Sequence, residues 1–137
     1  MPGTYAHIAV ANSIPNALRE RSAPSEVTSA ALSWLKYMEL GAVSPDYPYL
    51  VLGSDDAKDW ADRMHKGETG ALLNAGVDFI SNMKRGFDRQ KATAWLLGYA
   101  SHVTADMTVH PIVEMKVGPY ATNKKLHRAC EMHQDTF

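Results

Sequence analysis

The sequence predicts an all-α protein, and three observations lead to this prediction. Apolar residues recur three and four positions apart over long stretches, as they do on the buried face of an amphipathic helix. No stretch shows the alternation of apolar and polar residues that marks a half-buried strand. Glycine, serine and proline, which favour helix ends, lie at the borders of the periodic stretches. We therefore interpret residues 1–137 as a single domain, a multi-helix bundle without internal repeats.

The first helix is predicted over residues 4–12, with Thr4 as its N-cap. Pro15 lacks the N–H group that a helix interior needs, so we expect the helix to break or restart there. The polar residues 19–25 then form a connection to the next helix.

The second helix has the most regular pattern. Ser25 can cap its start, and Gly41 supplies a C-terminal stop. Its apolar face is expected to be core and has these members: Val27, Ala30, Ala31, Trp34, Leu35 and Met38. In residues 44–49, two prolines flank Asp46. Because proline excludes both a regular helix and a central strand, we predict a loop there.

Two further helices are predicted in the middle of the chain. One begins at Ser54 and runs to His65, with acidic residues in its first turn, near the positive end of the helix dipole. The other covers residues 70–84, and Gly86 is its expected stop. Its apolar positions keep helical phase: Leu72, Leu73, Val77, Phe79, Ile80 and Met83.

The last two predicted helices carry many of the side chains that can bind metals. The first begins near Asp88, and Pro111 is expected to end it. A loop follows, and residues 123–137 form the final helix. Because this helix ends soon after Glu131, we expect the bundle to be C-terminally incomplete in these 137 residues.

The composition narrows the class of protein. The formal net charge is −1 and no basic stripe is visible, so a stable nucleic-acid complex is not expected. The single cysteine, Cys130, cannot form an internal disulfide. No apolar run is long enough to cross a bilayer, and the N-terminus does not resemble a signal peptide. We expect a cytoplasmic protein, or a secreted one if a leader was removed.

Three side chains that can bind a metal are spaced four residues apart in one predicted helix: His102, Asp106 and His110. This spacing places them on one face. Burying such a row is costly unless a metal ion neutralises and orders it. The final helix repeats the spacing with His127 and Glu131. Taken alone, the pair of His102 and Asp106 fits a structural hydrogen bond as well as it fits two metal ligands. The pair of His127 and Glu131 equally fits a solvent-exposed contact between residues four apart.

His65 and Asp46 favour the metal interpretation, because one lies at a helix end and the other in the proline-rich loop. Imidazoles and carboxylates without a thiolate cluster suit zinc better than iron or manganese. The motifs of competing helical metalloproteins do not occur: paired Glu-x-x-His, HExxH and an adjacent His-Asp doublet are all missing. His133 lies outside these faces and is expected to be exposed.

The order of these motifs resembles the zinc-dependent phospholipase C family, whose all-α fold is shared with P1-type nucleases. The resemblance covers nearly the whole chain and rests on five segments: Tyr5-Ala6-His7, Ser44-Pro45-Asp46, Trp60 to His65, His102-Val103-Thr104-Ala105-Asp106 and His127-Arg128-Ala129-Cys130-Glu131. Each segment is short, but their order and spacing together are specific.

The resemblance implies a cluster of two or three zinc ions. It assigns one ion to four ligands: Asp46, His65, His102 and Asp106. It assigns a second ion to three ligands: His110, His127 and Glu131. A third site of the family uses an N-terminal histidine, the bridging aspartate and an N-terminal tryptophan. His7 and Asp106 match this pattern, whereas the chain begins Met1-Pro2.

The resemblance also implies a zinc-dependent phosphoester hydrolase, first of all a phospholipase C that cleaves a head-group phosphodiester and contacts a membrane surface transiently. Asp46 is the candidate base that activates water, a role that competes with zinc binding. Tyr47 and Tyr49 either line a pocket for a choline-like group or simply pack. The alternatives are a P1-like nuclease or phosphomonoesterase and a non-catalytic helical module with structural zinc. The sequence does not indicate an oligomeric state.

Overall fold

The computed structural model describes residues 3–134 and contains helices but no strand in that range, which confirms the predicted all-α class. In chain order the elements are α1 (Thr4–Glu20), α2 (Ser25–Ser33), α3 (Leu35–Val43), the 3₁₀ helix η1 (Ser44–Leu50), α4 (Asp55–His65), α5 (Thr69–Asn82), α6 (Phe87–Val117) and α7 (Tyr120–Gln134). Among the described residues, no helix has the length and apolar character needed to cross a bilayer.

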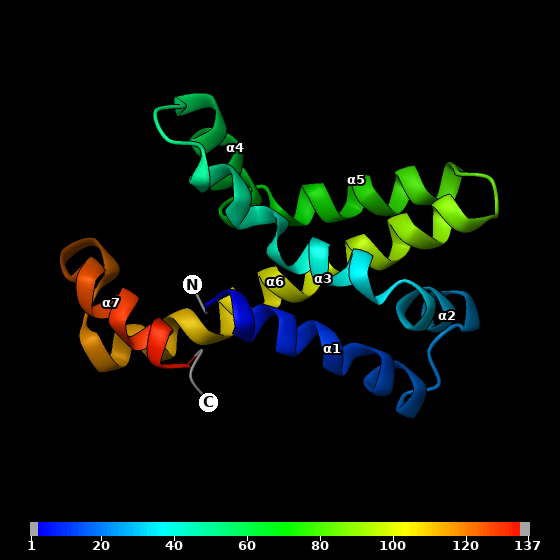
Figure 1. The fold of residues 1–137 in the computed structure, drawn as a ribbon, viewed down its shortest axis with the longest axis horizontal. Coiled ribbons are helices and arrows are strands. Elements are labelled where there is room, and N and C mark those ends of the chain that lie inside the picture. The colour runs from blue at the N-terminus through cyan, green and yellow to red at the C-terminus, as the bar shows by residue number, and fades with distance from the viewer. Residues whose placement is uncertain (1–2, 135–137) are drawn as a thin grey trace.

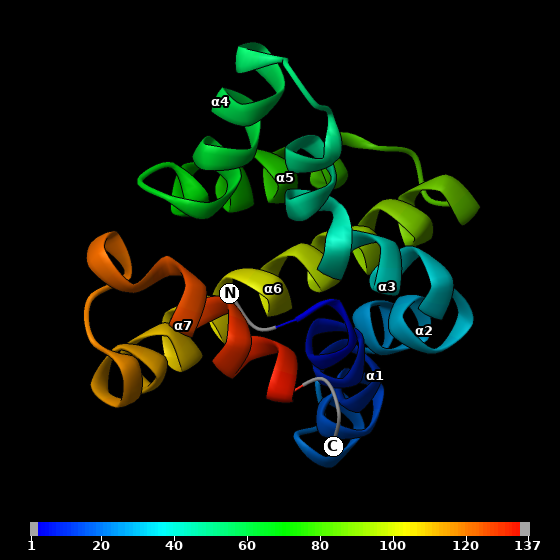
Figure 2. The same ribbon diagram turned by 60° about the vertical axis from the view of Figure 1, so that its left-hand side comes forward.

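The long helix α6 is the centre of the arrangement, because α1, α2, α3, α5 and α7 all contact it. In both views α4 and α5 lie on one side of α6, and α1 lies on the other (Figure 1 and Figure 2). Two apolar clusters form the core. One joins α1, α2, α3 and α6, and the other joins the end of α4 to α6 through Met64, Tyr99 and Val103.

The packing of α3 against α6 is unusually close and depends on two glycines. A methyl group at Gly41 would overlap the carbonyl oxygen of Trp95, and one at Gly98 would overlap that of Met38. Gly41 lies inside α3, so its predicted role as a helix stop is wrong. The sequence pattern predicted that this glycine ends a helix. In the structure, its lack of a side chain allows α3 and α6 to come into close contact.

Both prolines that were expected to end helices lie inside them instead. α1 continues through Pro15 to Glu20, and α6 continues through Pro111 to Val117. A proline in a helix interior costs about 3 kcal/mol through the lost hydrogen bond and ring clash. Tertiary packing offsets this cost in both helices, since Pro15 is buried in α1 and Val113, two residues after Pro111 in α6, is 1% exposed.

Three other boundaries differ from the prediction. The predicted helix 25–41 is two helices, because Trp34 has φ −126° and ψ 41°, outside the helical region. The proline-rich segment, expected to be a loop, is the 3₁₀ helix η1. The final helix begins at Tyr120 and is kinked at Asn123 (φ −127°, ψ 33°), and its predicted end at 135–137 lies outside the described residues.

The predicted start of α4 is confirmed. Ser54 is its N-cap, and the hydroxyl accepts a hydrogen bond from the backbone N–H of Ala57 at 3.2 Å. Asp55 and Asp56 occupy the first turn, as expected. Gly86, predicted to stop the preceding helix, lies just before α6, four residues after α5 ends at Asn82.

Candidate metal centre

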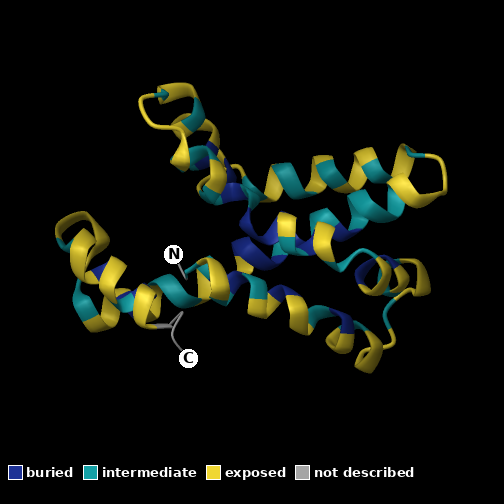
Figure 3. Ribbon diagram, viewed as in Figure 1, coloured by how far each residue is buried: buried dark blue, intermediate teal, exposed yellow. Residues whose placement is uncertain are grey.

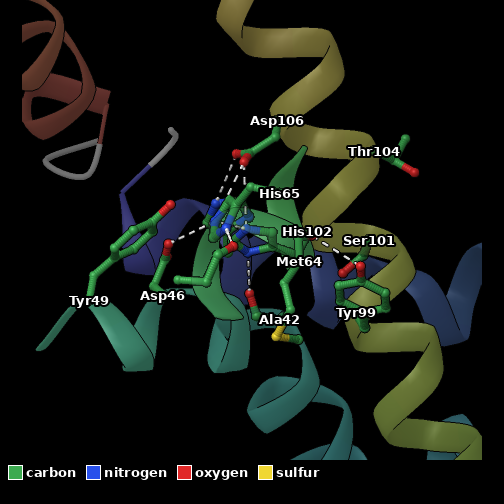
Figure 4. A network of polar contacts seen from close by, with 12 residues as sticks. Ala42, Asp46, Tyr49, Met64, His65, Tyr99, Ser101, His102, Thr104 and Asp106 are labelled. Atoms are coloured by element: carbon green, nitrogen blue, oxygen red, sulfur yellow. Dashed lines mark hydrogen bonds and ion pairs between the residues drawn. The ribbon is translucent and has the colours of Figure 1, made fainter. Parts of the chain in front are cut away.

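Five predicted ligands from four separate elements meet around one point beside α6. Figure 4 shows Asp46, His65, His102 and Asp106 among them. α1 supplies His7, η1 supplies Asp46 and α4 supplies His65 as its last residue, while α6 supplies His102 and Asp106. Their possible ligand atoms form two groups, each within 4.8 Å: His7, Asp46 and His102, and His65, His102 and Asp106.

Distances between these atoms fit shared coordination. The Nε2 atom of His65 lies 3.1 Å from Oδ1 of Asp46 and 3.0 Å from Nε2 of His102. Oδ2 of Asp106 lies 3.5 Å from Nε2 of His102 and 3.9 Å from Nε2 of His65. Because zinc binds nitrogen and oxygen at about 2 Å, two ligands of one ion lie within roughly 4 Å of each other.

Backbone carbonyls fix which nitrogen of each imidazole is available. Nδ1 of His102 donates to the carbonyl of Ala42 at 2.7 Å, and Nδ1 of His65 donates to the carbonyl of Ala61 at 2.7 Å. In each neutral ring the lone pair is then on Nε2. Two lone pairs facing each other at 3.0 Å repel unless a cation or a proton lies between them. This arrangement is typical of metal-binding histidines, whose other nitrogen donates to a carbonyl.

The two oxygens of Asp106 face different partners. Oδ2 faces His65 and His102, while Oδ1 lies 3.5 Å from Nε2 of His7. His7 is fully buried and stacks on His102 with ring centroids 3.9 Å apart. Within residues 3–134, neither nitrogen of His7 nor Oδ1 of Asp106 has a hydrogen-bond partner. Buried polar atoms are rarely left in this state, so a second ion between His7 and Asp106 fits these atoms.

The charges of the centre shift two pKa values in opposite directions. Burial opposes ionisation of Asp106, but its contacts with His102 and His7 outweigh burial and lower the pKa of its carboxyl. Burial alone would lower the pKa of His65, whereas the hydrogen bonds to Asp46 and the Ala61 carbonyl raise it above its ordinary value. Both shifts favour a cationic charge held between carboxylates.

The other three predicted ligands lie at the junction of α6 and α7 and belong to neither of the two close groups. His127 is fully buried, its Nε2 donates to the carbonyl of Gly118 at 2.9 Å, and its Nδ1 has no hydrogen-bond partner among the described residues. Glu131 is 5% exposed one turn further on, and the ring centroids of His110 and His127 are 6.1 Å apart. Burial lowers the pKa of His110, which favours the neutral form that binds metal.

A cavity of about 220 Å³ lies next to the centre, between the start of α1, η1 and α7. Among its lining residues are Asp46, Tyr47, Tyr49, Arg128 and Glu131. A larger groove of about 430 Å³, between α3, α5 and α6, contains none of the candidate ligands. The smaller cavity is therefore the one that a substrate of this centre would enter.

Sequence reasoning missed several contributors to the centre. The carbonyls of Ala42, Ala61 and Gly118 leave no signal in the sequence, because every residue has one. Tyr99 holds the end of α4 in place, since its hydroxyl donates to the carbonyl of Met64 at 3.0 Å. Arg128 could have been found, because it lies three residues before Glu131 on the same helical face. His133 is exposed, as expected.

A family model described as zinc dependent phospholipase C matches residues 6–137, almost the whole chain. No curated protein and no solved structure matches this sequence.

Proposed function

Because this chain belongs to the zinc-dependent phospholipase C family, we propose that it hydrolyses the phosphodiester between the head group and the diacylglycerol of a phospholipid. The observation that carries this proposal is the pair of Nε2 lone pairs, from His65 and His102, that face each other between the carboxylates of Asp46 and Asp106. Nitrogen and oxygen ligands without a thiolate suit zinc.

Three sets of side chains would hold the ions. His65, His102, Asp106 and Asp46 form the first set, and His7 with Asp106 forms part of another. His110, His127 and Glu131 are the proposed third set, supported by the orphaned Nδ1 of His127. When bound, zinc supplies a water of lowered pKa and positive charge beside the phosphate ester.

Asp46 is the proposed general base. It is half-buried, it lies at the border between the metal centre and the cavity, and η1 fixes its backbone between two prolines. One oxygen faces His65, while the side chain also lines the cavity that water and substrate enter. A carboxylate in this position can take the proton that water loses as it attacks phosphorus.

The cavity walls offer contacts for both ends of a head group. The hydroxyl of Tyr49 donates to Asp62 at 2.7 Å, which holds its ring beside His65 with centroids 5.4 Å apart. Tyr47 lines the same cavity and is half exposed. Arg128 has no ion pair with any residue in the range 3–134, so its guanidinium is available for a phosphate oxygen.

The first test is the zinc content of protein purified without a chelator or a histidine tag, measured by elemental analysis. We expect two or three equivalents per chain. A protein that contains none, and takes up none when zinc is added, would contradict the proposal.

The second test distinguishes a role of Asp46 as general base from a role as metal ligand only. Asp46→Asn should abolish hydrolysis of phosphatidylcholine, because the amide cannot accept the proton, while zinc content is retained, because the amide oxygen and the other three ligands can still hold the ion. Asp56→Asn, in the exposed first turn of α4, is the matched control and should leave hydrolysis unchanged. Loss of zinc from Asp46→Asn would instead assign Asp46 to metal binding alone.

A further inference from the structure

The last residue of η1 and the link from η1 to α4 expose consecutive aliphatic side chains. Leu50 is 74% exposed, Val51 is 54% exposed and Leu52 is 94% exposed. The whole stretch from Leu50 to Gly53 is exposed, as its colour in Figure 3 indicates. Single exposed leucines are common on protein surfaces, but adjacent ones that cover no core need a reason.

These side chains continue directly into the mouth of the cavity beside the metal centre. Leu50 lines that cavity, together with Tyr47 from η1 and Met132 from α7. Tyr47 is 49% exposed and Met132 is 58% exposed, so both reach from the cavity to the surface. We call these five residues the apolar rim: Tyr47, Leu50, Val51, Leu52 and Met132. The rim therefore combines two segments that are about 80 residues apart in the chain.

A positive charge accompanies the rim. Arg128 lines the same cavity and makes no ion pair within the described part of the chain. Aliphatic side chains next to an available guanidinium match the two chemical layers of a phospholipid surface, acyl chains below and phosphates above. A purely apolar rim would fit a protein partner equally well, and the charge is what favours lipid.

We propose that the apolar rim docks this protein on a phospholipid surface, with Leu50 and Leu52 inserted among the acyl chains and the cavity mouth facing the head groups. This inference deepens the proposed function, on which it rests, because it states how a lipid substrate reaches the cavity. The contact is interfacial and reversible, since a few inserted side chains bury little area compared with a spanning helix.

The test is sedimentation of the protein with unilamellar phosphatidylcholine vesicles, at 4 °C and with released head group measured to confirm that the lipid stays intact. The variant Leu50→Ser/Leu52→Ser should bind at least tenfold more weakly than the unchanged protein, because burying one leucine already favours binding by roughly that factor. Both side chains are exposed, so the variant should fold normally, and circular dichroism checks this.

The matched control replaces two exposed apolar residues, also two positions apart, in α5: Val77→Ser/Phe79→Ser. This variant should bind vesicles like the unchanged protein. Equal binding by the rim variant, loss of binding in the α5 variant alone, or no vesicle binding by the unchanged protein would each overturn the proposal. So would a change of oligomeric state in the rim variant, which would assign the rim to self-association. Vesicle binding needs no hydrolysis, so this test can fail or succeed independently of the proposed activity.

Discussion

The Nε2 atoms of His65 and His102 lie 3.0 Å apart, although each ring already donates its Nδ1 hydrogen to a backbone carbonyl. The two residues are 37 positions apart in the chain and come from different helices. Their approach is therefore a product of helix packing. The close approach of the two nitrogens is unfavourable without a positive charge between the rings. Replacing either histidine therefore tests the metal centre directly.

Replacing His65 should remove zinc from this centre. His65→Gln takes away one of the two facing nitrogens, so we expect the loss of about one zinc equivalent per chain. Elemental analysis after dialysis measures this loss, and His133→Gln, on the exposed end of α7, is the control. Retention of the full zinc content by His65→Gln would show that His65 is a structural histidine.

The close contact between α3 and α6 should make Gly98 intolerant of a methyl group. Alanine normally stabilises a helix by up to about 1 kcal/mol relative to glycine. Gly98→Ala should instead destabilise the protein by about 1–3 kcal/mol or more, because the added carbon overlaps the Met38 carbonyl and pushes the helices apart. Gly70→Ala, in α5 with open space around it, is the control. Denaturant unfolding of both variants measures whether each substitution raises or lowers the free energy of unfolding.

The separation of α3 from α6 in Gly98→Ala should also weaken zinc binding, since the Ala42 carbonyl that orients His102 belongs to α3. If Gly98→Ala lowers stability yet leaves zinc affinity unchanged, the orienting role of this contact is wrong. A chelator competition at a pH near 7 gives the affinity without an activity assay.

Tyr99 is expected to act as a positioning residue for His65. Tyr99→Phe removes the hydrogen bond to the carbonyl of Met64, the residue before His65, and leaves that buried carbonyl without its donor. We expect a loss of about 1 kcal/mol in stability and a weaker affinity for zinc. Tyr37→Phe, at an exposed tyrosine, should change neither quantity. Unchanged zinc affinity in Tyr99→Phe would limit Tyr99 to packing.

The pH dependence of stability should reverse when zinc is added. In the metal-free protein the pKa of His65 is raised, so its contribution to stability is present below about pH 6.5 and is lost as the pH rises through the raised value. The pKa of Asp106 is lowered, so its contribution is present above about pH 3.9 and is lost only as the pH falls through the lowered value. Metal-free protein should therefore become less stable as the pH rises from about 6.5 through the raised pKa of His65.

Zinc and the proton compete for the same nitrogen of His65. For each proton that zinc must displace, the affinity for zinc should fall about tenfold when the pH falls by one unit. Melting temperatures measured with and without zinc at several pH values test both statements. A zinc-induced gain in melting temperature that does not grow with pH would contradict them.

The sequence by itself determined the helical class and the residues that could bind metal. Helical periodicity and the four-residue spacing of His102 and Asp106 are local properties, and local geometry places such pairs on one face whatever the rest of the chain does. The capping of α4 by Ser54 was predictable for the same reason.

Only the tertiary structure decided where the helices end and how the ligands meet. α1 and α6 continue through Pro15 and Pro111 because contacts along the whole helix outweigh one local penalty. Gly41 serves helix contact rather than termination, a distinction that depends on the backbone of a distant segment. The pairing of His65 with His102, and the contact of His102 with the Ala42 carbonyl that orients its ring, arise from that same packing. No periodicity encodes them, because they depend on distances between helices rather than on positions along one.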